Sequence, residues 1–357
     1  MDNSFLKINN GVENPGQFNE KALKKLKKKK KLSVEEFVEG IFNGDRTILS
    51  QAITLVESKL NRDNDKAQLV IEHCLPRVGK SMRIGITGVP GVGKSTFIEA
   101  LGKHITALGR KLAVIAIDPS STLSKGSILG DKTRMEKLAT DPNAFIRPSP
   151  SAGTLGGVAR KTREIIILCE AAGFDTIFVE TVGVGQSEIL VQSMVDFFLL
   201  LMLAGAGDEL QGIKRGIMEI ADAIIINKAD GDNIMKANIA KGEIENAVHI
   251  FPMPESGWKP SVSTCSSKYK TDIDKVWELI NRYFNLVKAN GYFKINRDKQ
   301  IKSRMYDFIN TELSDSFYNN QLVREMIPEI EAELMSRKTT SYAAARKLLY
   351  IYFKGKK

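Results

Sequence analysis

The sequence predicts an α/β fold, with a mostly parallel, doubly wound sheet that carries a P-loop and with helical extensions on both sides of it. From residue 81 onward, short apolar runs alternate with stretches of helical periodicity, which is typical of a parallel sheet covered by helices on both faces. The first apolar run leads into a glycine-rich turn and then an amphipathic helix, the order that a phosphate-binding loop requires. The predicted strands are residues 84–87, 112–117, 144–147, 176–179, 197–203, 223–226 and 262–264.

The glycine-rich turn matches the pattern G-x-x-x-x-G-K-[S/T] in full. Backbone N–H groups of such a loop, together with the N-terminus of the next helix, form an anion site for the β- and γ-phosphates. Lys94 would place a positive charge on these phosphates, and the Ser95 hydroxyl would hold Mg²⁺. The alternative is a glycine-rich turn with an incidental lysine, which the flanking strand and helix disfavour. The predicted phosphate-binding residues are Gly88, Val89, Pro90, Gly91, Val92, Gly93, Lys94, Ser95 and Thr96.

The net charge of +10 on 357 residues is concentrated in one short stretch. Residues 21–32 contain eight lysines and no acidic residue, and removing those eight charges leaves +2 for the rest of the chain. No aromatic residue is interleaved in this run, so we expect no nucleic-acid binding. The run is interpreted as a solvated arm, with an acidic protein or RNA partner as the alternatives.

Composition also bears on the compartment. The longest apolar run, residues 197–204, is too short to span a membrane, and the first residues lack the pattern of a signal peptide. Three cysteines lie far apart at Cys74, Cys169 and Cys265. We therefore expect a cytoplasmic protein, without membrane contact, whose cysteines are buried thiols rather than disulfides or metal ligands.

The chain is expected to have four parts: a basic, mobile tail over residues 1–32, an N-terminal helical extension over 33–80, the P-loop core over 81–290 and a C-terminal helical dimerisation extension over 291–357. Ser33 and Glu36 have the spacing of a capping box and predict where the first helix begins. The last helices carry too little apolar surface for a core of their own. We therefore expect them to dock on a second subunit.

The segment after the sixth predicted strand indicates which base is bound. Asn227, Lys228 and Asp230 form an N-K-x-D sequence there. A carboxylate accepts hydrogen bonds from N1–H and the 2-amino group of guanine, whereas adenine offers an acceptor at N1 and no 2-amino group. Ser266 and Ser267, after the last strand, are expected to complete the nucleotide site. The alternative is that Asp230 only caps a helix.

Acidic residues follow two further strands. Glu180 and Gly183 occupy the place of the acidic residue and glycine of a switch II, where the Gly183 amide would contact the γ-phosphate. Asp118 and Asp131 are the other acidic candidates near the metal and the attacking water. Ser95, Asp118, Asp131 and Glu180 are thus the predicted metal site, and Lys94 joins the three acidic residues as the predicted catalytic set. Loop caps are the alternative for Asp118 and Asp131. Gln186 is not assigned to position water, so slow intrinsic hydrolysis is expected.

These residues together resemble the methylmalonyl-CoA mutase-associated GTPases, the MeaB/ArgK family. This family belongs to the branch of P-loop GTPases shared with signal-recognition and metal-insertion GTPases. The resemblance covers roughly residues 40–350, and the phrases that carry it are residues 44–46, 52–58, 88–95, 118–121, 130–135, 147–157, 180–188, 204–216 and 227–232.

The resemblance implies a homodimeric GTPase that uses GTP and Mg²⁺. It also implies a chaperone that gates adenosylcobalamin loading and the reactivation of an adenosylcobalamin-dependent acyl-CoA mutase. Residues 205–215 resemble the family's extra loop near the partner. The chain departs from the family at Ser267, where the family has alanine, and at residues 268–271, which replace a glycine-containing turn.

Two other functions are alternatives for such a chain. A P-loop kinase of the arginine/ornithine transport (ArgK) type would need an acceptor site, and the sequence has no such constellation. A nickel-insertion GTPase would carry cysteine or histidine clusters, which this chain lacks.

Overall fold

The computed structural model describes residues 32–58, 60–118, 135–150, 155–181, 187–205 and 215–354. The lysine run, Asp131, Gly183 and Gln186 lie outside these ranges, as do the Asp118 side chain and most of residues 205–215. The helices are α2 Val34–Phe42, α3 Arg46–Glu57, α4 Asn61–Cys74, η1 Leu75–Arg77, α5 Lys94–Ala107, α7 Glu136–Ala139, α8 Leu155–Ala171, α9 Ser187–Gln192, α11 Arg215–Ile220, η2 Gly231–Asn233, α12 Ile234–His249, α13 Ile273–Ala289, α14 Tyr292–Tyr318, α15 Gln321–Met335 and α16 Ser341–Lys354.

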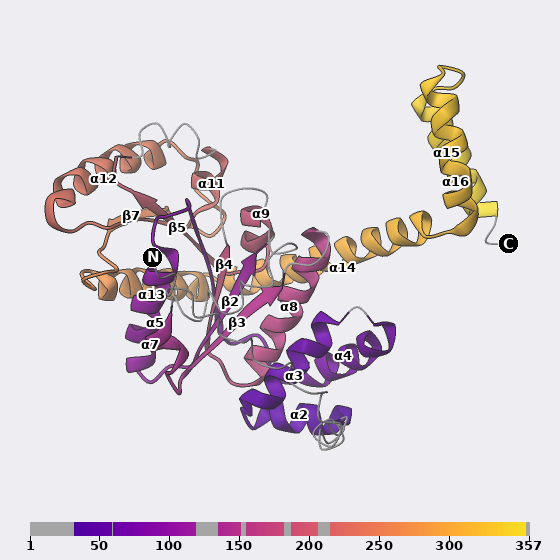
Figure 1. Cartoon of the computed structure of the whole chain (residues 1–357). Helices are drawn as coiled ribbons and strands as arrows, with labels where there is room; N and C mark the ends of the chain where they lie inside the picture. Colours follow the sequence, from indigo (N-terminus) through magenta and orange to yellow (C-terminus); the bar gives the residue numbers. More distant parts are fainter. Residues whose placement is uncertain are drawn as a thin grey trace, which may run out of the picture.

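Seven strands form one sheet in the order β3-β2-β4-β1-β5-β6-β7, and every pairing in it is parallel. The strands are β1 Met82–Gly88, β2 Leu112–Asp118, β3 Ala144–Pro150, β4 Thr176–Thr181, β5 Phe197–Leu203, β6 Ala223–Asn227 and β7 Ser261–Thr264. This confirms the predicted α/β class and all seven predicted strands. Most of the strand residues are buried, as expected where helices cover both faces (Figure 1).

Six of the seven strands run further than predicted, and for β4 and β6 the extension takes in a predicted site residue. Glu180 was expected after β4, but it lies inside that strand, paired with Ile86 of β1 and Ala116 of β2. Asn227 was expected after β6 and is its last residue. Glu180 is paired on both sides and Asn227 with Leu203 of β5, and such pairing satisfies backbone groups of polar residues, so a strand end predicted from hydrophobicity alone comes too early.

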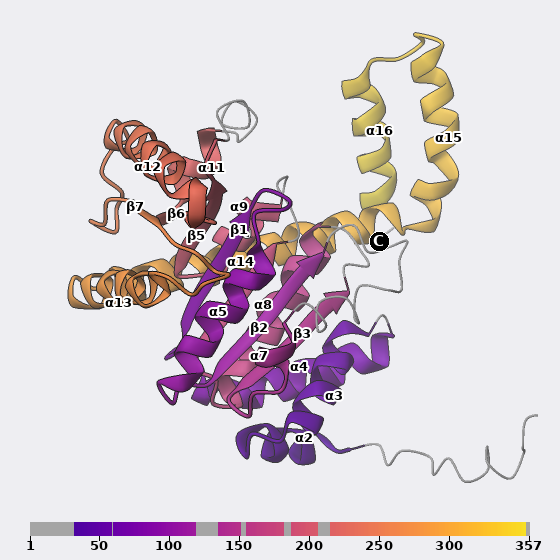
Figure 2. The ribbon, with the colours of Figure 1, turned by 60° about the vertical axis from the view of Figure 1, so that its left-hand side comes forward.

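Helices cover both faces of the sheet. Figure 2 shows α5 in front of the strands, while α8 lies behind them with α14 beyond it. Helices α2, α3 and α4 pack together and against α8. The predicted capping box is confirmed at the start of α2: the Glu36 amide donates to Ser33 Oγ at 3.1 Å, and the Ser33 amide donates to Glu36 Oε2 at 2.7 Å.

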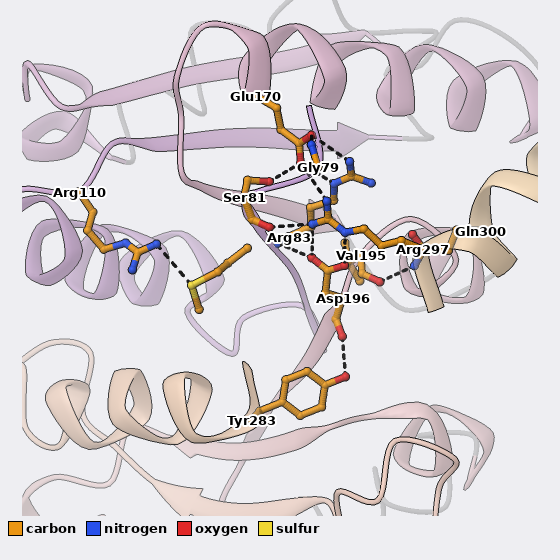
Figure 3. Close-up of polar contacts among 11 residues, drawn as sticks. Gly79, Ser81, Arg83, Arg110, Glu170, Val195, Asp196, Tyr283, Arg297 and Gln300 are labelled. Atoms are coloured by element: carbon orange, nitrogen blue, oxygen red, sulfur yellow. Dashed lines mark hydrogen bonds and ion pairs between the residues drawn. The ribbon is translucent and has the colours of Figure 1, made fainter. Parts of the chain in front are cut away.

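A buried ionic network closes the end of the sheet opposite the P-loop (Figure 3). Arg297 of α14 donates to both carboxylate oxygens of Asp196, at 2.8 and 2.7 Å, and lies 3.5 Å from Glu170 of α8. Glu170 also accepts hydrogen bonds from Arg83 and from the Ser81 hydroxyl. Burial raises the pKa of Glu170, but the two arginines outweigh burial and hold that pKa below its ordinary value. The network therefore fixes the start of α14 to the core.

The rest of the C-terminal extension leaves the core. Helices α15 and α16 form a hairpin that projects away from the sheet at the far end of α14 (Figures 1 and 2). Val323, Ile330, Ala344 and Tyr352 are its buried apolar residues. Among the described residues, no helix is long and apolar enough to cross a membrane.

Gly85 in β1 offers a test of this packing. A Cβ built on it would lie 2.8 Å from Phe198 Cδ2 and 2.9 Å from Val191 Cγ1, so we expect Gly85→Ala to lower the free energy of unfolding by about 1–3 kcal/mol. Gly242→Ala in α12 is the matched control, because its Cβ would meet nothing within 4 Å. We expect that variant to gain about 0.5–1 kcal/mol, as measured by urea unfolding. Equal effects of the two changes would contradict the packing described for α9 on β1.

Candidate nucleotide-binding site

The P-loop joins β1 to α5 and is shaped by three glycines. Gly91 and Gly93 have φ values of 79° and 92°, in the left-handed region that favours glycine. A Cβ on Gly93 would lie 3.1 Å from Asn227 Nδ2, and one on Gly88 would lie 2.6 Å from the Leu201 carbonyl oxygen. Side chains at Gly88 and Gly93 would therefore collide with the neighbouring strands β5 and β6. The loop ends at the N-terminus of α5, whose first residue is Lys94.

Lys94 lies back across the loop. Its Nζ donates to the carbonyl oxygens of Gly88 at 2.7 Å and Val89 at 3.4 Å. Burial lowers the pKa of this ammonium, and the charges of Glu180 and Glu188 act in the opposite direction. The lysine is therefore held in the P-loop with a pKa below its ordinary value, because burial outweighs the two carboxylates.

Parts of the predicted metal site come together at three adjacent strands. Glu180 is buried in β4, Ser95 lies half-buried in the first turn of α5 after β1, and Asp118 ends β2. Because the sheet order places β4 between β2 and β1, the chain positions of all three converge at one edge of the sheet. Carboxylate and hydroxyl oxygens are ligands that Mg²⁺ accepts, so these residues fit such an ion.

Glu188 was not among the predicted site residues. It is fully buried in the first turn of α9, and its charge acts on Lys94. A buried carboxylate whose charge acts on the P-loop lysine is a candidate residue of the nucleotide site. Its place in the phrase 180–188 was the only signal that the sequence offered.

Asn227 joins the P-loop to the segment after β7. Its Nδ2 donates to the Val92 carbonyl at 2.9 Å. Its Oδ1 accepts from the Ser267 amide at 3.1 Å and from the Ser267 hydroxyl at 2.7 Å. The side chain is 1% exposed. One N–H of the amide and the amide oxygen are thus used between two loops, so Asn227 ties the P-loop to the segment after β7.

Lys228 and Asp230 lie on either side of the same turn. Lys228 has a φ of 59°, uncommon for a lysine, and its Nζ donates to the Gly91 carbonyl at 2.9 Å. The Asp230 carboxylate accepts a 2.5 Å hydrogen bond from the Ser266 hydroxyl. Asp230 stands at the N-cap of η2 but makes no side-chain cap bond, which disfavours the capping alternative.

The segment after β7 closes without glycine. Ser266 and Thr271 exchange backbone hydrogen bonds of 3.1 and 3.0 Å, and Lys270 takes the left-handed conformation with a φ of 60°. This short bridge holds the Ser266 hydroxyl on Asp230. The replacement of the family's glycine turn by residues 268–271 is therefore accommodated by one strained lysine.

Two groups donate to Asn227 Oδ1, the Ser267 amide and the Ser267 hydroxyl, and mutation can separate their contributions. We expect Asn227→Ala to weaken guanine nucleotide binding by about 2–4 kcal/mol, because it leaves the Val92 carbonyl and the Ser267 amide unpaired. Ser267→Ala keeps the amide on Asn227, so a loss of only about 0.5–1.5 kcal/mol is expected. Titration with fluorescent GDP measures both. Similar losses in the two variants would rule out this role for the Asn227 amide.

Comparisons with known proteins show the family to which the chain belongs. The profile of the family described as "Methylmalonyl Co-A mutase-associated GTPase MeaB" matches residues 49–322. A probable GTPase of Mycobacterium tuberculosis is 45% identical over 319 residues, which cover 89% of this chain and 95% of that protein. The mouse protein "Methylmalonic aciduria type A homolog, mitochondrial" is 42% identical over 91% of this chain and 80% of its own length.

A bacterial relative and a solved structure extend these findings. "GTPase ArgK" of Escherichia coli is 48% identical over 75% of this chain and 81% of its own length. The crystal structure of a "LAO/AO transport system kinase" superposes with a TM-score of 0.73 and 36% identity, covering 89% of this chain and 96% of that one. With its P-loop, its N-K-x-D turn and its parallel sheet in place, this chain is a GTPase and belongs to the methylmalonyl-CoA mutase-associated MeaB family.

Proposed function

We propose that this GTPase gates the loading of adenosylcobalamin into a cobalamin-dependent acyl-CoA mutase of the methylmalonyl-CoA mutase type and helps to reactivate that mutase. The observation that carries the proposal is the match of residues 49–322 to a family described by its association with this mutase. The name of the mouse relative, 42% identical to this chain, supports the same metabolic link.

The site residues supply the parts of a nucleotide-controlled switch. When bound, Mg²⁺ would neutralise charge on the β- and γ-phosphates, held by Ser95, Glu180, Asp118 and Asp131. Lys94 would leave the carbonyl oxygens of Gly88 and Val89 and turn to the phosphates. The Gly183 amide would contact the γ-phosphate, so its presence or loss would change the segment between β4 and α9.

Reconstitution with a purified adenosylcobalamin-dependent methylmalonyl-CoA mutase tests the proposal. We expect the two proteins to co-elute and cofactor transfer into the mutase to depend on GTP. Lys94→Ala should remain folded but lose GTP turnover and with it the GTP-dependent change, since the lysine acts on transition-state charge. Cofactor transfer that is identical with and without GTP would contradict the gating role. Release of free phosphate would separate hydrolysis from phosphoryl transfer of the kind implied by the name "LAO/AO transport system kinase" of one solved relative.

The Asp230→Asn variant tests which base is bound. An amide loses one acceptor oxygen and presents a donor to the guanine N–H groups, whereas xanthine has a carbonyl in place of the 2-amino group. We expect GTP binding to weaken by about 2–4 kcal/mol, XTP binding to improve and ATP to stay poorly bound. Titrations of fluorescent GDP and XDP against both proteins measure this preference. A variant that still prefers guanine would remove Asp230 from base recognition.

We infer that the C-terminal extension makes the protein a homodimer. Met305, Ile309 and Leu313 recur every four residues along α14 and are 51%, 43% and 57% exposed. Such a stripe on a helix that projects from the core is suited to a matching helix of a second copy. The hairpin of α15 and α16 beyond it carries further exposed apolar side chains, among them Met335, Tyr342 and Phe353.

The double variant Ile309→Glu/Leu313→Glu is expected to run as a monomer in light scattering. Two carboxylates buried without partners at a helix contact destabilise it by about 3 kcal/mol or more. Asn310→Glu is the control, because it adds one carboxylate at an exposed position next to Ile309. Wild-type protein that already has the mass of one chain would contradict the dimer.

A further inference from the structure

Helix α9 stands between β4, which carries Glu180, and β5 in the chain. In sequence it follows the segment that contains Gly183. Its first turn carries the buried Glu188, whose charge acts on Lys94. Its other end continues through residues 193–196, here called the α9–β5 linker, into β5. Along the chain, α9 is therefore the first described helix after the segment that is expected to contact the γ-phosphate.

The contact between α9 and the sheet leaves little free space. A Cβ on Gly85 of β1 would lie 2.9 Å from Val191 Cγ1 in α9 and 3.1 Å from Val195 Cγ2 in the linker. Val191 and Val195 are both buried. Close-packed side chains transmit displacement rather than absorb it, so α9 and the linker are expected to shift together.

Helix α14 binds this linker at two successive residues (Figure 3). Gln300 Nε2 donates to the Val195 carbonyl at 2.7 Å. Arg297, three residues earlier on α14, makes the two hydrogen bonds to Asp196 already described. Residues three apart lie on the same face of a helix, so one side of α14 follows the linker.

Arg163 of α8 adds a third connection at the end of α9. Its Nη2 donates to Ser193 Oγ at 2.8 Å, and the Ser193 hydroxyl donates in turn to the Leu190 carbonyl at 2.7 Å. The Nη1 atom of Arg163 lies 3.6 Å from Asp307 Oδ2 on α14. Arg163 is 12% exposed but Asp307 is 59% exposed, so this ion pair is open to solvent on the α14 side and contributes less than the hydrogen bond to Ser193.

We propose that the α9–β5 linker couples the nucleotide state of the GTPase site to the C-terminal arm, which is formed by α14, α15 and α16. Gln300, Arg163 and Ser193 act as positioning residues: they pass a shift of α9 to α14, and α14 carries α15 and α16. The proposal deepens the proposed function and rests on the nucleotide-dependent change near Gly183. It gives the chain a route by which GTP alters the helices furthest from the phosphates.

Anchoring and coupling can be distinguished because different residues serve them. Arg297 is buried and bonded to both Asp196 and Glu170, so its removal is expected to disturb the fold itself. Gln300 and Ser193 are half-buried and lie at the margin of the network. Gln300→Leu and Ser193→Ala remove single connections and leave the anchor in place. Lys302→Leu, at an exposed position of α14, is the matched control.

The test is hydrogen–deuterium exchange of the full-length protein, saturated with GDP or with a non-hydrolysable GTP analogue. Amide exchange reports local opening, and couplings between sites commonly amount to fivefold or more. In the wild type and in Lys302→Leu we expect α14 peptides to exchange about fivefold differently in the two states. In Gln300→Leu and Ser193→Ala we expect most of that difference to vanish, while peptides of α5 still respond to nucleotide.

Wild-type α14 peptides that exchange equally in both states would overturn the coupling. So would Gln300→Leu and Ser193→Ala proteins that keep the wild-type difference. Neither measurement involves the mutase, so failure of the reconstitution leaves the coupling standing. Failure of GTP to bind at all would overturn both proposals together.

Discussion

The carboxylate of Asp196 is the point on which the arrangement of this protein depends. It lies buried between α9 and β5, and it accepts hydrogen bonds from the Arg83 amide and from the Arg297 guanidinium. A carboxylate taken out of water is unfavourable unless it is paired, so these three groups stay together. Through them the first strand, the fifth strand and the long helix α14 share one fixed point.

This constraint divides the molecule into two functional ends. At the carboxyl ends of the strands lie the P-loop, Glu180 and the N-K-x-D turn, where parallel strands bring distant residues to one edge. At the opposite ends the charges are neutralised among themselves and hold α14. The predicted site residues thus lie at one end of the strands, and the ionic network that holds α14 lies at the other. Along the chain, α9 leads from the first end to the second.

Asn227 plays the corresponding part at the nucleotide side. It spends both halves of its amide on holding Val92 and Ser267 together. Lys228 strengthens the same link by donating to Gly91. The P-loop and the segment after β7 are thus connected by side chains of the N-K-x-D turn.

The sequence by itself determined the α/β class, the seven strands, the P-loop and the capping box at Ser33. These depend on local order: a run of apolar residues, a glycine spacing or a capping residue and its partner lie within a few positions of each other. Sequence also placed Asn227 and Asp230 in one turn, because that motif is contiguous.

Only the tertiary structure decided the rest. Glu188 lies eight residues beyond Glu180 in the chain, and no periodicity brings it to Lys94; the fold of α9 does. Arg297 and Asp196 are separated by 101 positions, and Arg83 and Glu170 by 87, so the order of residues does not assign these partners. Such contacts depend on how helices stack on a finished sheet. A long-range pair forms only after the elements that carry it are in place, and that is why α14, its anchor and its link to α9 could not be predicted from residue order.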